Sequence, residues 1–153
     1  MDQEMLAARL LFEARLNVGK PRDIGDTPLG RRRIAPVEGG IFKGPRLSGR
    51  FLDGADWLLR RPDGVTRMDV RTTLETDDGA LIYLQYQGMR AGPAEVLARI
   101  DRGEVVDAKD YYMRIVLSFE TGAPQYAWLN AILAVGYGDR QPGGPIYRVF
   151  ELL

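Results

Sequence analysis

The sequence predicts an all-β protein, a closed antiparallel up-and-down β-barrel of about eight to ten strands with one short helix near residues 93–102. Apolar and polar residues alternate with a period of two over several segments, which is typical of strands with one buried face. The 18 Gly and nine Pro residues fall between these segments and indicate short strands joined by turns. Because only one segment has a helical pattern, neighbouring strands lack the crossover helices of a parallel sheet. A two-sheet β-sandwich is the alternative.

The N-terminal part of the chain contains the first expected strand over residues 10–18, where every second side chain is apolar and Gly19-Lys20-Pro21 ends the pattern. A second strand is expected over residues 30–37 and begins with three arginines, Arg31–Arg33. Such a short charge run is usually a solvated strand end. The alternative is an anion clamp at a cavity mouth, since guanidinium groups bind carboxylates and phosphates in a bidentate way.

The following stretch is rich in glycine and predicts two strands, near residues 41–43 and 47–52, around a bend. It holds no nucleotide-binding glycine motif. A further short strand is expected from Asp56 to Arg60. Residues 68–87 then predict a hairpin, because Asp78-Gly79 suits a tight turn between two arms rich in β-formers. The sequence leaves open which face of strand 67–77 points into the barrel.

The C-terminal part begins with the expected helix, Pro93–Arg102, where Pro93 occupies the first turn and Gly103 follows the end. Strands are expected over residues 111–121, 131–137 and 146–152, with a loop over 139–145. The first and last strands are both apolar on one face, so we expect them to pair and close the barrel.

The composition excludes several classes of function. The 153 residues predict one domain, 1–153, and the balance of 21 basic with 21 acidic residues predicts no binding to nucleic acid or membrane surfaces. No apolar segment is long enough to span a membrane, the N-terminus lacks the pattern of a signal peptide, and Cys is absent, so we expect a cytoplasmic protein. The absence of His removes the Ser-His-Asp triad and the usual zinc ligands. The loop acids lack calcium-loop spacing, so we expect no metal and no other cofactor.

Four stretches of the chain, in this order, resemble the small bacterial and fungal proteins of domain-of-unknown-function family 3237. They are RRRIAPVEGGIFKGPRLSG (31–49), GADW (54–57), MDVRTTLETDDGALI (68–82) and YAWLN (126–130). The resemblance implies a single-domain antiparallel β-barrel, in agreement with the strand pattern. It implies no particular activity, since the family lacks a general biochemical assignment.

A barrel of about eight strands encloses room for one small ligand, so the candidate site lies inside it or at its mouth. We expect Asp56 to serve as acid or base and Arg71 to polarise an oxygen or hold a carboxylate. The expected ligand-binding residues are Trp57, Asp69, Tyr83, Tyr126, Trp128 and Asn130. In the alternative, structural interpretation, Asp56 caps a turn, the tryptophans belong to the core, and Arg71 pairs with an acid on an outer face.

These residues favour a small-molecule-binding barrel, an enzyme of hydrolase, isomerase or cyclase type that performs acid–base chemistry on a small apolar or aromatic organic molecule. The alternative is a non-catalytic ligand carrier or sensor of the lipocalin type. We expect a homodimer, because two-fold dimers are the commonest oligomers of soluble proteins.

Overall fold

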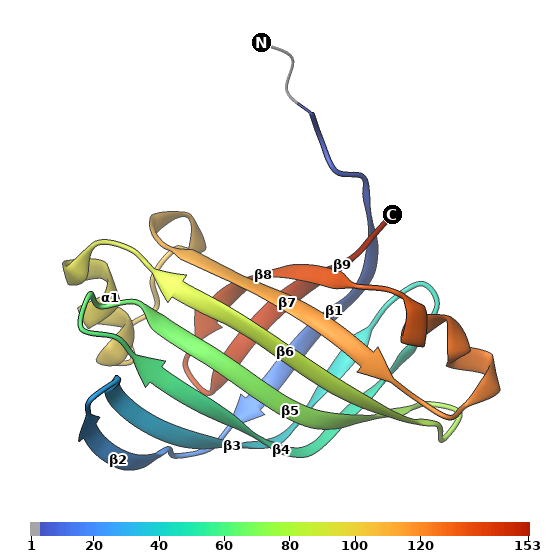
Figure 1. Cartoon of the computed structure of the whole chain (residues 1–153), viewed down its shortest axis with the longest axis horizontal. Helices are drawn as coiled ribbons and strands as arrows, with labels where there is room; N and C mark the ends of the chain where they lie inside the picture. Colours follow the sequence, from blue (N-terminus) through green and yellow to red (C-terminus); the bar gives the residue numbers. More distant parts are fainter. Residues whose placement is uncertain (1–3) are drawn as a thin grey trace.

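Antiparallel strands wrap into a barrel in the computed structural model, which describes residues 4–153 (Figure 1). The strands are β1 (Ala8–Val18), β2 (Arg22–Thr27), β3 (Gly30–Lys43), β4 (Ser48–Arg60), β5 (Thr66–Thr76), β6 (Leu81–Ala91), β7 (Tyr112–Glu120), β8 (Ala134–Gln141) and β9 (Gly144–Leu152). The helical elements are α1 (Ala94–Asp101), and the 3₁₀ segments η1 (Ala108–Asp110) and η2 (Pro124–Ala131). No helix within these described residues is long and apolar enough to cross a membrane.

The barrel closes because β1 pairs with strands from both ends of the sheet. The strand order is β1-β9-β8-β7-β6-β5-β4-β3-β2, and β1 also pairs with β3, so eight strands form the cylinder and β2 lies outside it against β3. The first and last strands are antiparallel, with Ala14 opposite Tyr147. The predicted closed up-and-down barrel and the pairing of its first and last strands are confirmed, and the sandwich alternative is excluded.

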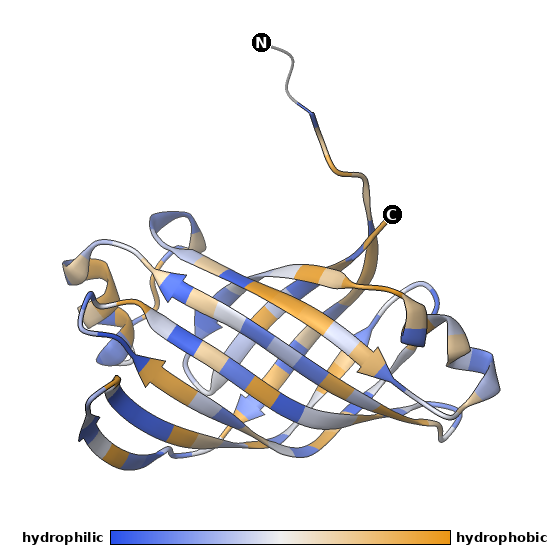
Figure 2. Ribbon diagram, viewed as in Figure 1, coloured by the Kyte–Doolittle hydropathy of each residue, from blue (hydrophilic) through white to orange (hydrophobic). Residues whose placement is uncertain are grey.

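Hydrophilic and hydrophobic residues alternate along the strands (Figure 2). Because successive side chains point to opposite faces of a strand, this alternation places apolar side chains in the interior. On β5, the side chains of Met68, Val70, Thr72 and Leu74 are buried, which settles the inward face of that strand. Aromatic rings fill the half of the barrel near η2: the ring of Phe42 lies 5.4 Å from that of Phe12 and 5.8 Å from that of Phe51. The internal cavity lies in the other half of the barrel, beside α1.

The predicted helix and central hairpin are confirmed, whereas several strand boundaries differ. Strand β3 runs unbroken to Lys43, because Gly39 and Gly40 adopt positive φ and let the strand coil without ending. Strand β2 escaped prediction, since RDIGDT is short, polar and mostly exposed. The expected loop over 139–145 is instead the tight β8–β9 hairpin, and YAWLN lies within η2.

Candidate functional site

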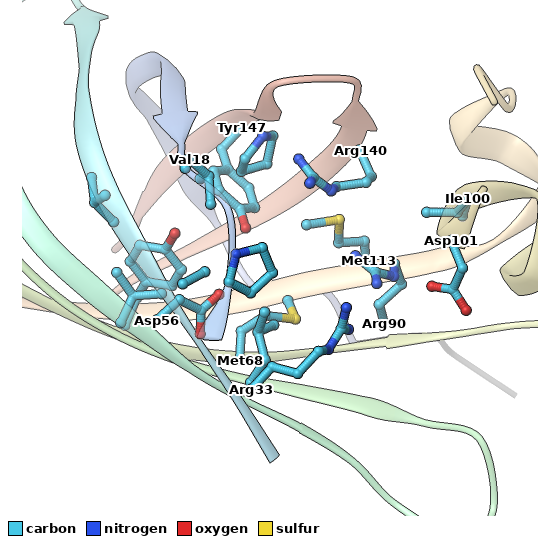
Figure 3. Close-up of a pocket in the computed structure, with 18 residues that line it drawn as sticks. Val18, Arg33, Asp56, Met68, Arg90, Ile100, Asp101, Met113, Arg140 and Tyr147 are labelled. Carbon is cyan, nitrogen blue, oxygen red and sulfur yellow. The ribbon is translucent and has the colours of Figure 1, made fainter. Parts of the chain in front are cut away.

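A cavity of about 140 Å³ lies inside the barrel at the end beside α1 (Figure 3). Its apolar wall includes Val18, Leu58, Met68, Val70 and Met113. Its polar lining comes from strands β3, β4, β6, β8 and β9 and from α1: Arg33, Asp56, Tyr86, Arg90, Asp101, Arg140 and Tyr147. The cavity therefore joins an apolar surface to a small set of convergent polar groups, as ligand sites commonly do.

Asp56 brings a carboxyl group into this cavity from β4. It lies opposite Val70 of β5 and so points inward, and the surface that it leaves exposed lines the cavity. Its Oδ1 accepts a hydrogen bond of 3.1 Å from the backbone N–H of Asp69. Burial raises the pKa of Asp56 to about 6, although this hydrogen bond and the charges of Arg90 and Arg140 act in the opposite direction. The carboxyl can therefore donate or accept a proton near neutral pH.

Two buried tyrosines line the same cavity. Tyr86 and Tyr147 are 3% and 2% exposed, and their rings lie 5.6 Å apart in an edge-to-face arrangement. Burial raises the pKa of both phenols, and the nearby charge of Asp56 raises both further. The two hydroxyl groups therefore stay protonated and can donate hydrogen bonds to an oxygen atom of a ligand.

Three arginines from three strands supply the positive charge of the site. Figure 3 shows Arg33, Arg90 and Arg140 gathered on the side of the cavity that faces α1, with Asp56 on the other side. Arg90 is 7% exposed. Within residues 4–153, none of these three guanidinium groups forms an ion pair with a carboxylate.

The structure places Arg71 away from the cavity, which corrects its expected position beside Asp56. Inward and outward side chains alternate along β5, so the buried Val70 and Thr72 send Arg71 to the outer face. There its guanidinium lies 5.9 Å from the centre of the Trp57 ring. Trp57 of β4 and Asp69 of β5 follow the same alternation. Their neighbours Asp56 and Val70 point inward, so the side chains of Trp57 and Asp69 lie on the outer face of the barrel.

The remaining predicted ligand-binding residues also lie outside the cavity. Tyr83 is 39% exposed on β6. Three others belong to η2 at the far end of the barrel, and each has a structural contact. The Tyr126 hydroxyl donates to Asp78 (3.0 Å), the Trp128 ring packs under the guanidinium of Arg46 (3.6 Å), and Asn130 forms two hydrogen bonds with the backbone of Thr121 (2.8 and 3.0 Å).

Five polar residues of the lining were not among the predicted site residues: Tyr86, Arg90, Asp101, Arg140 and Tyr147. Arg90 could have been found from the alternation along β6. It lies on the same face as the buried Leu84 and Tyr86, where a charged side chain is unexpected. Of the arginine triplet only Arg33 lines the cavity, whereas Arg31 forms ion pairs with Asp23 and Asp26 on the surface. Among residues 4–153, no three acidic side chains gather in a way that could hold a metal ion.

The sequence matches the model of a family described as "Protein of unknown function (DUF3237)" over residues 6–152. A UPF0311 protein of Rhodopseudomonas palustris is 38% identical over 149 residues, which are 97% of each chain. The crystal structure of the conserved protein of unknown function from R. palustris superimposes with a TM-score of 0.95 at 37% identity, over 99% of this chain and 100% of that one.

A more distant relative carries a named activity. The hydroalkoxylation enzyme of the fungus Penicillium herquei is 25% identical over 126 residues, which are 82% of this chain and 70% of that one. The crystal structure of an enzyme from P. herquei shares the fold, with a TM-score of 0.75 at 20% identity over 100% of this chain and 99% of that one.

Proposed function

The chain belongs to the DUF3237 family, whose description assigns no activity, and we propose that it is an enzyme that uses Asp56 as general acid and base on a small organic molecule inside the barrel. The observation that carries the proposal is the position of Asp56, a carboxyl group in an internal cavity beside two buried phenols. A carboxyl whose environment moves its pKa toward neutrality is suited to proton transfer.

The reaction we propose is the addition of a hydroxyl group to a carbon–carbon double bond within one molecule, an isomerase or cyclase type of chemistry. The name of the P. herquei relative, a hydroalkoxylation enzyme, supports this class. In such an addition the oxygen bonds to one alkene carbon and a proton is delivered to the other. Asp56 in its acid form would give its proton to carbon, and the resulting carboxylate would take the proton that the hydroxyl oxygen loses, so the carboxyl group is regenerated.

The size and lining of the cavity agree with a small apolar or aromatic ring as substrate. A cavity of about 140 Å³ is close to the engineered cavities of about 150 Å³ that bind benzene. Met68 and Met113 offer flexible apolar surface against such a ring. The hydroxyl groups of Tyr86 and Tyr147 would orient an oxygen substituent beside the carboxyl.

The test is conversion in D₂O of a panel of small phenols that carry an alkenyl side chain, with the products analysed by mass spectrometry. We expect cyclic isomers with one deuterium on carbon, and a loss of at least about a hundredfold in rate for Asp56→Asn. Asp53→Asn, an exposed acid of the same strand, is the matched control and should keep the wild-type rate.

A carrier or sensor is the second candidate, since the cavity is enclosed within a barrel of the size that holds single ligands. In that case, probes from the panel bind but are recovered unchanged and without deuterium. Binding without exchange or conversion would contradict the enzyme proposal.

A further inference from the structure

We propose that Arg33, Arg90 and Arg140 form an anion subsite that takes the carboxylate of a small organic acid bound in the cavity. The proposal deepens the proposed function by naming the class of ligand, and it rests on that function only in taking this cavity as the ligand site. The three side chains converge from β3, β6 and β8 on one side of the cavity (Figure 3). Guanidinium groups present several donors in a planar fork that matches a carboxylate.

Arg90 carries a buried charge that no ion pair of the described residues compensates. This side chain is 7% exposed, and within residues 4–153 it has no carboxylate as an ion-pair partner. A buried charge without a counter-ion costs stability, so such residues are normally paired. Burial and the neighbouring charge of Arg140 both lower the pKa of Arg90, whereas the charge of Asp101 acts in the opposite direction. An anionic ligand would supply the missing partner.

The acids near the arginine side of the cavity are already engaged with other groups. Asp101 of α1 forms an ion pair of 2.7 Å with Arg60. Asp23 pairs with Arg31. Asp139 accepts hydrogen bonds from the Tyr111 hydroxyl (3.4 Å) and from the side-chain amide of Gln141 (2.9 Å). One nitrogen of Arg140 donates to the backbone carbonyl of Gln141 (3.0 Å), but none of these acids forms an ion pair with Arg33, Arg90 or Arg140.

The arginines and the proposed proton-transfer group lie at opposite ends of the cavity. Tyr86 and Arg90 point inward from β6 with Gly88 between them, and four residues of strand span about 13 Å. Met68, which pairs with Gly88, lines the wall between the two ends. An acid held by Arg90 would thus lay its apolar body along Met68 and direct its far end toward Asp56. The ligand class is an amphipathic acid, with a ring or alkenyl group a few bonds from the carboxylate.

The test compares two probes of nearly equal shape, 3-phenylpropionate and its neutral amide, by isothermal titration calorimetry. For the wild-type protein we expect the carboxylate to bind about tenfold to a hundredfold more tightly than the amide. In Arg90→Gln and in Arg140→Gln this preference should fall to about twofold or less, while the affinity for the amide changes little. Arg114→Gln, an exposed residue of the outer face, is the matched control and should keep the full preference.

Two results would overturn the subsite: equal affinity of the wild-type protein for both probes, or a full preference that survives in Arg140→Gln. If Arg90→Gln fails to fold, Arg140→Gln and Arg33→Gln decide the question, because both side chains are only partly buried. Asp56→Asn separates this inference from the proposed function, since it should abolish conversion and keep the preference for the carboxylate. Selective binding of the acid without conversion of any substrate refutes the enzyme and leaves the subsite, whereas conversion without charge preference refutes the subsite alone.

Discussion

The carboxyl group of Asp56 accepts a hydrogen bond from the backbone N–H of Asp69, 3.1 Å away on the neighbouring strand. The two residues lie on different sides of the barrel wall, because Asp56 points inward and the Asp69 side chain points outward. The backbone thus orients the buried acid without using any side chain of the cavity. One neutral donor replaces only part of the water that an ionised carboxylate loses on burial, which is why the pKa of Asp56 stays raised.

The raised pKa of Asp56 predicts that stability falls as the pH rises through its titration. The pKa is about 6 in the folded protein against an ordinary value of 3.8, so between these values the folded state retains a proton that the unfolded state releases. The contribution of this proton to the free energy of unfolding is up to about 3 kcal/mol. It is fully present below about pH 4 and is lost as the pH rises through about 6. Asp56→Asn removes this titration and keeps an acceptor for the Asp69 N–H.

The measurement is urea unfolding of the wild-type protein and Asp56→Asn at pH 8 and pH 4.5. The variant should be more stable than the wild type at pH 8, and the difference should shrink at pH 4.5. Asp53→Asn should show no such pH-dependent difference from the wild type. Equal stability of Asp56→Asn and wild type at both pH values would mean that Asp56 is as well solvated as an exposed acid.

Tyr147→Phe should lower turnover of a converted phenol by about tenfold to a hundredfold, because it removes a hydrogen-bond donor from the cavity and leaves the ring in place. Its rate is compared with that of Tyr137→Phe, which changes an exposed tyrosine of β8. The free energy of unfolding of both variants should lie within about 1 kcal/mol of the wild-type value. A selective loss of rate in Tyr147→Phe, with folding intact, assigns the hydroxyl to ligand handling; equal rates would leave Tyr147 as a packing residue.

The sequence predicts the barrel well because the fold depends on patterns that are local in the chain. Alternation of apolar residues reports which segments are strands, and the single helical pattern coincides with α1. Strand β2 carries no such pattern, since it pairs only with β3 outside the cylinder and buries almost nothing. Its polar sequence is indistinguishable from a loop.

The site was harder to predict because it depends on which face of each strand turns inward. For β5 the choice between the Asp69–Arg71 face and the Met68–Val70 face decides the position of Arg71, and an apolar interior selects the second. Asp56 was predictable as a candidate, but its neighbours come from strands far away in sequence. Tyr147, for example, meets Tyr86 only because β9 returns to close the barrel.

The outward position of Arg71 predicts that Arg71→Ala leaves binding of both phenylpropionate and its amide within about twofold of the wild type. Arg71 contacts the outer wall through Trp57 and does not line the cavity. The same calorimetric titrations with Arg33→Ala give the comparison, because Arg33 lines the cavity and Arg71 does not. A selective loss of affinity for phenylpropionate in Arg71→Ala would show that the acid binds outside the barrel.

The closure of the barrel predicts that Gly40 tolerates no side chain. Gly40 lies opposite Leu16 where β3 meets β1, at a φ of +143°, and a Cβ atom there would lie 2.2 Å from the carbonyl oxygen of Arg15. Gly79 is the matched control, because it also has a positive φ, +86°, but an added Cβ would meet no atom within 4 Å. Alanine at Gly79 therefore costs only the backbone strain of about 1–2 kcal/mol.

Alanine at Gly40 adds a backbone clash to that strain and should cost at least about 3 kcal/mol, measured as the difference in free energy of unfolding in urea. Because the clash separates β1 from β3, we also expect Gly40→Ala to weaken phenylpropionate binding, whereas Gly79→Ala, at the hairpin turn far from α1, should bind as the wild type does. Equal losses of stability in the two variants would mean that the β1–β3 seam, which closes the cylinder, accommodates the added methyl group at no cost.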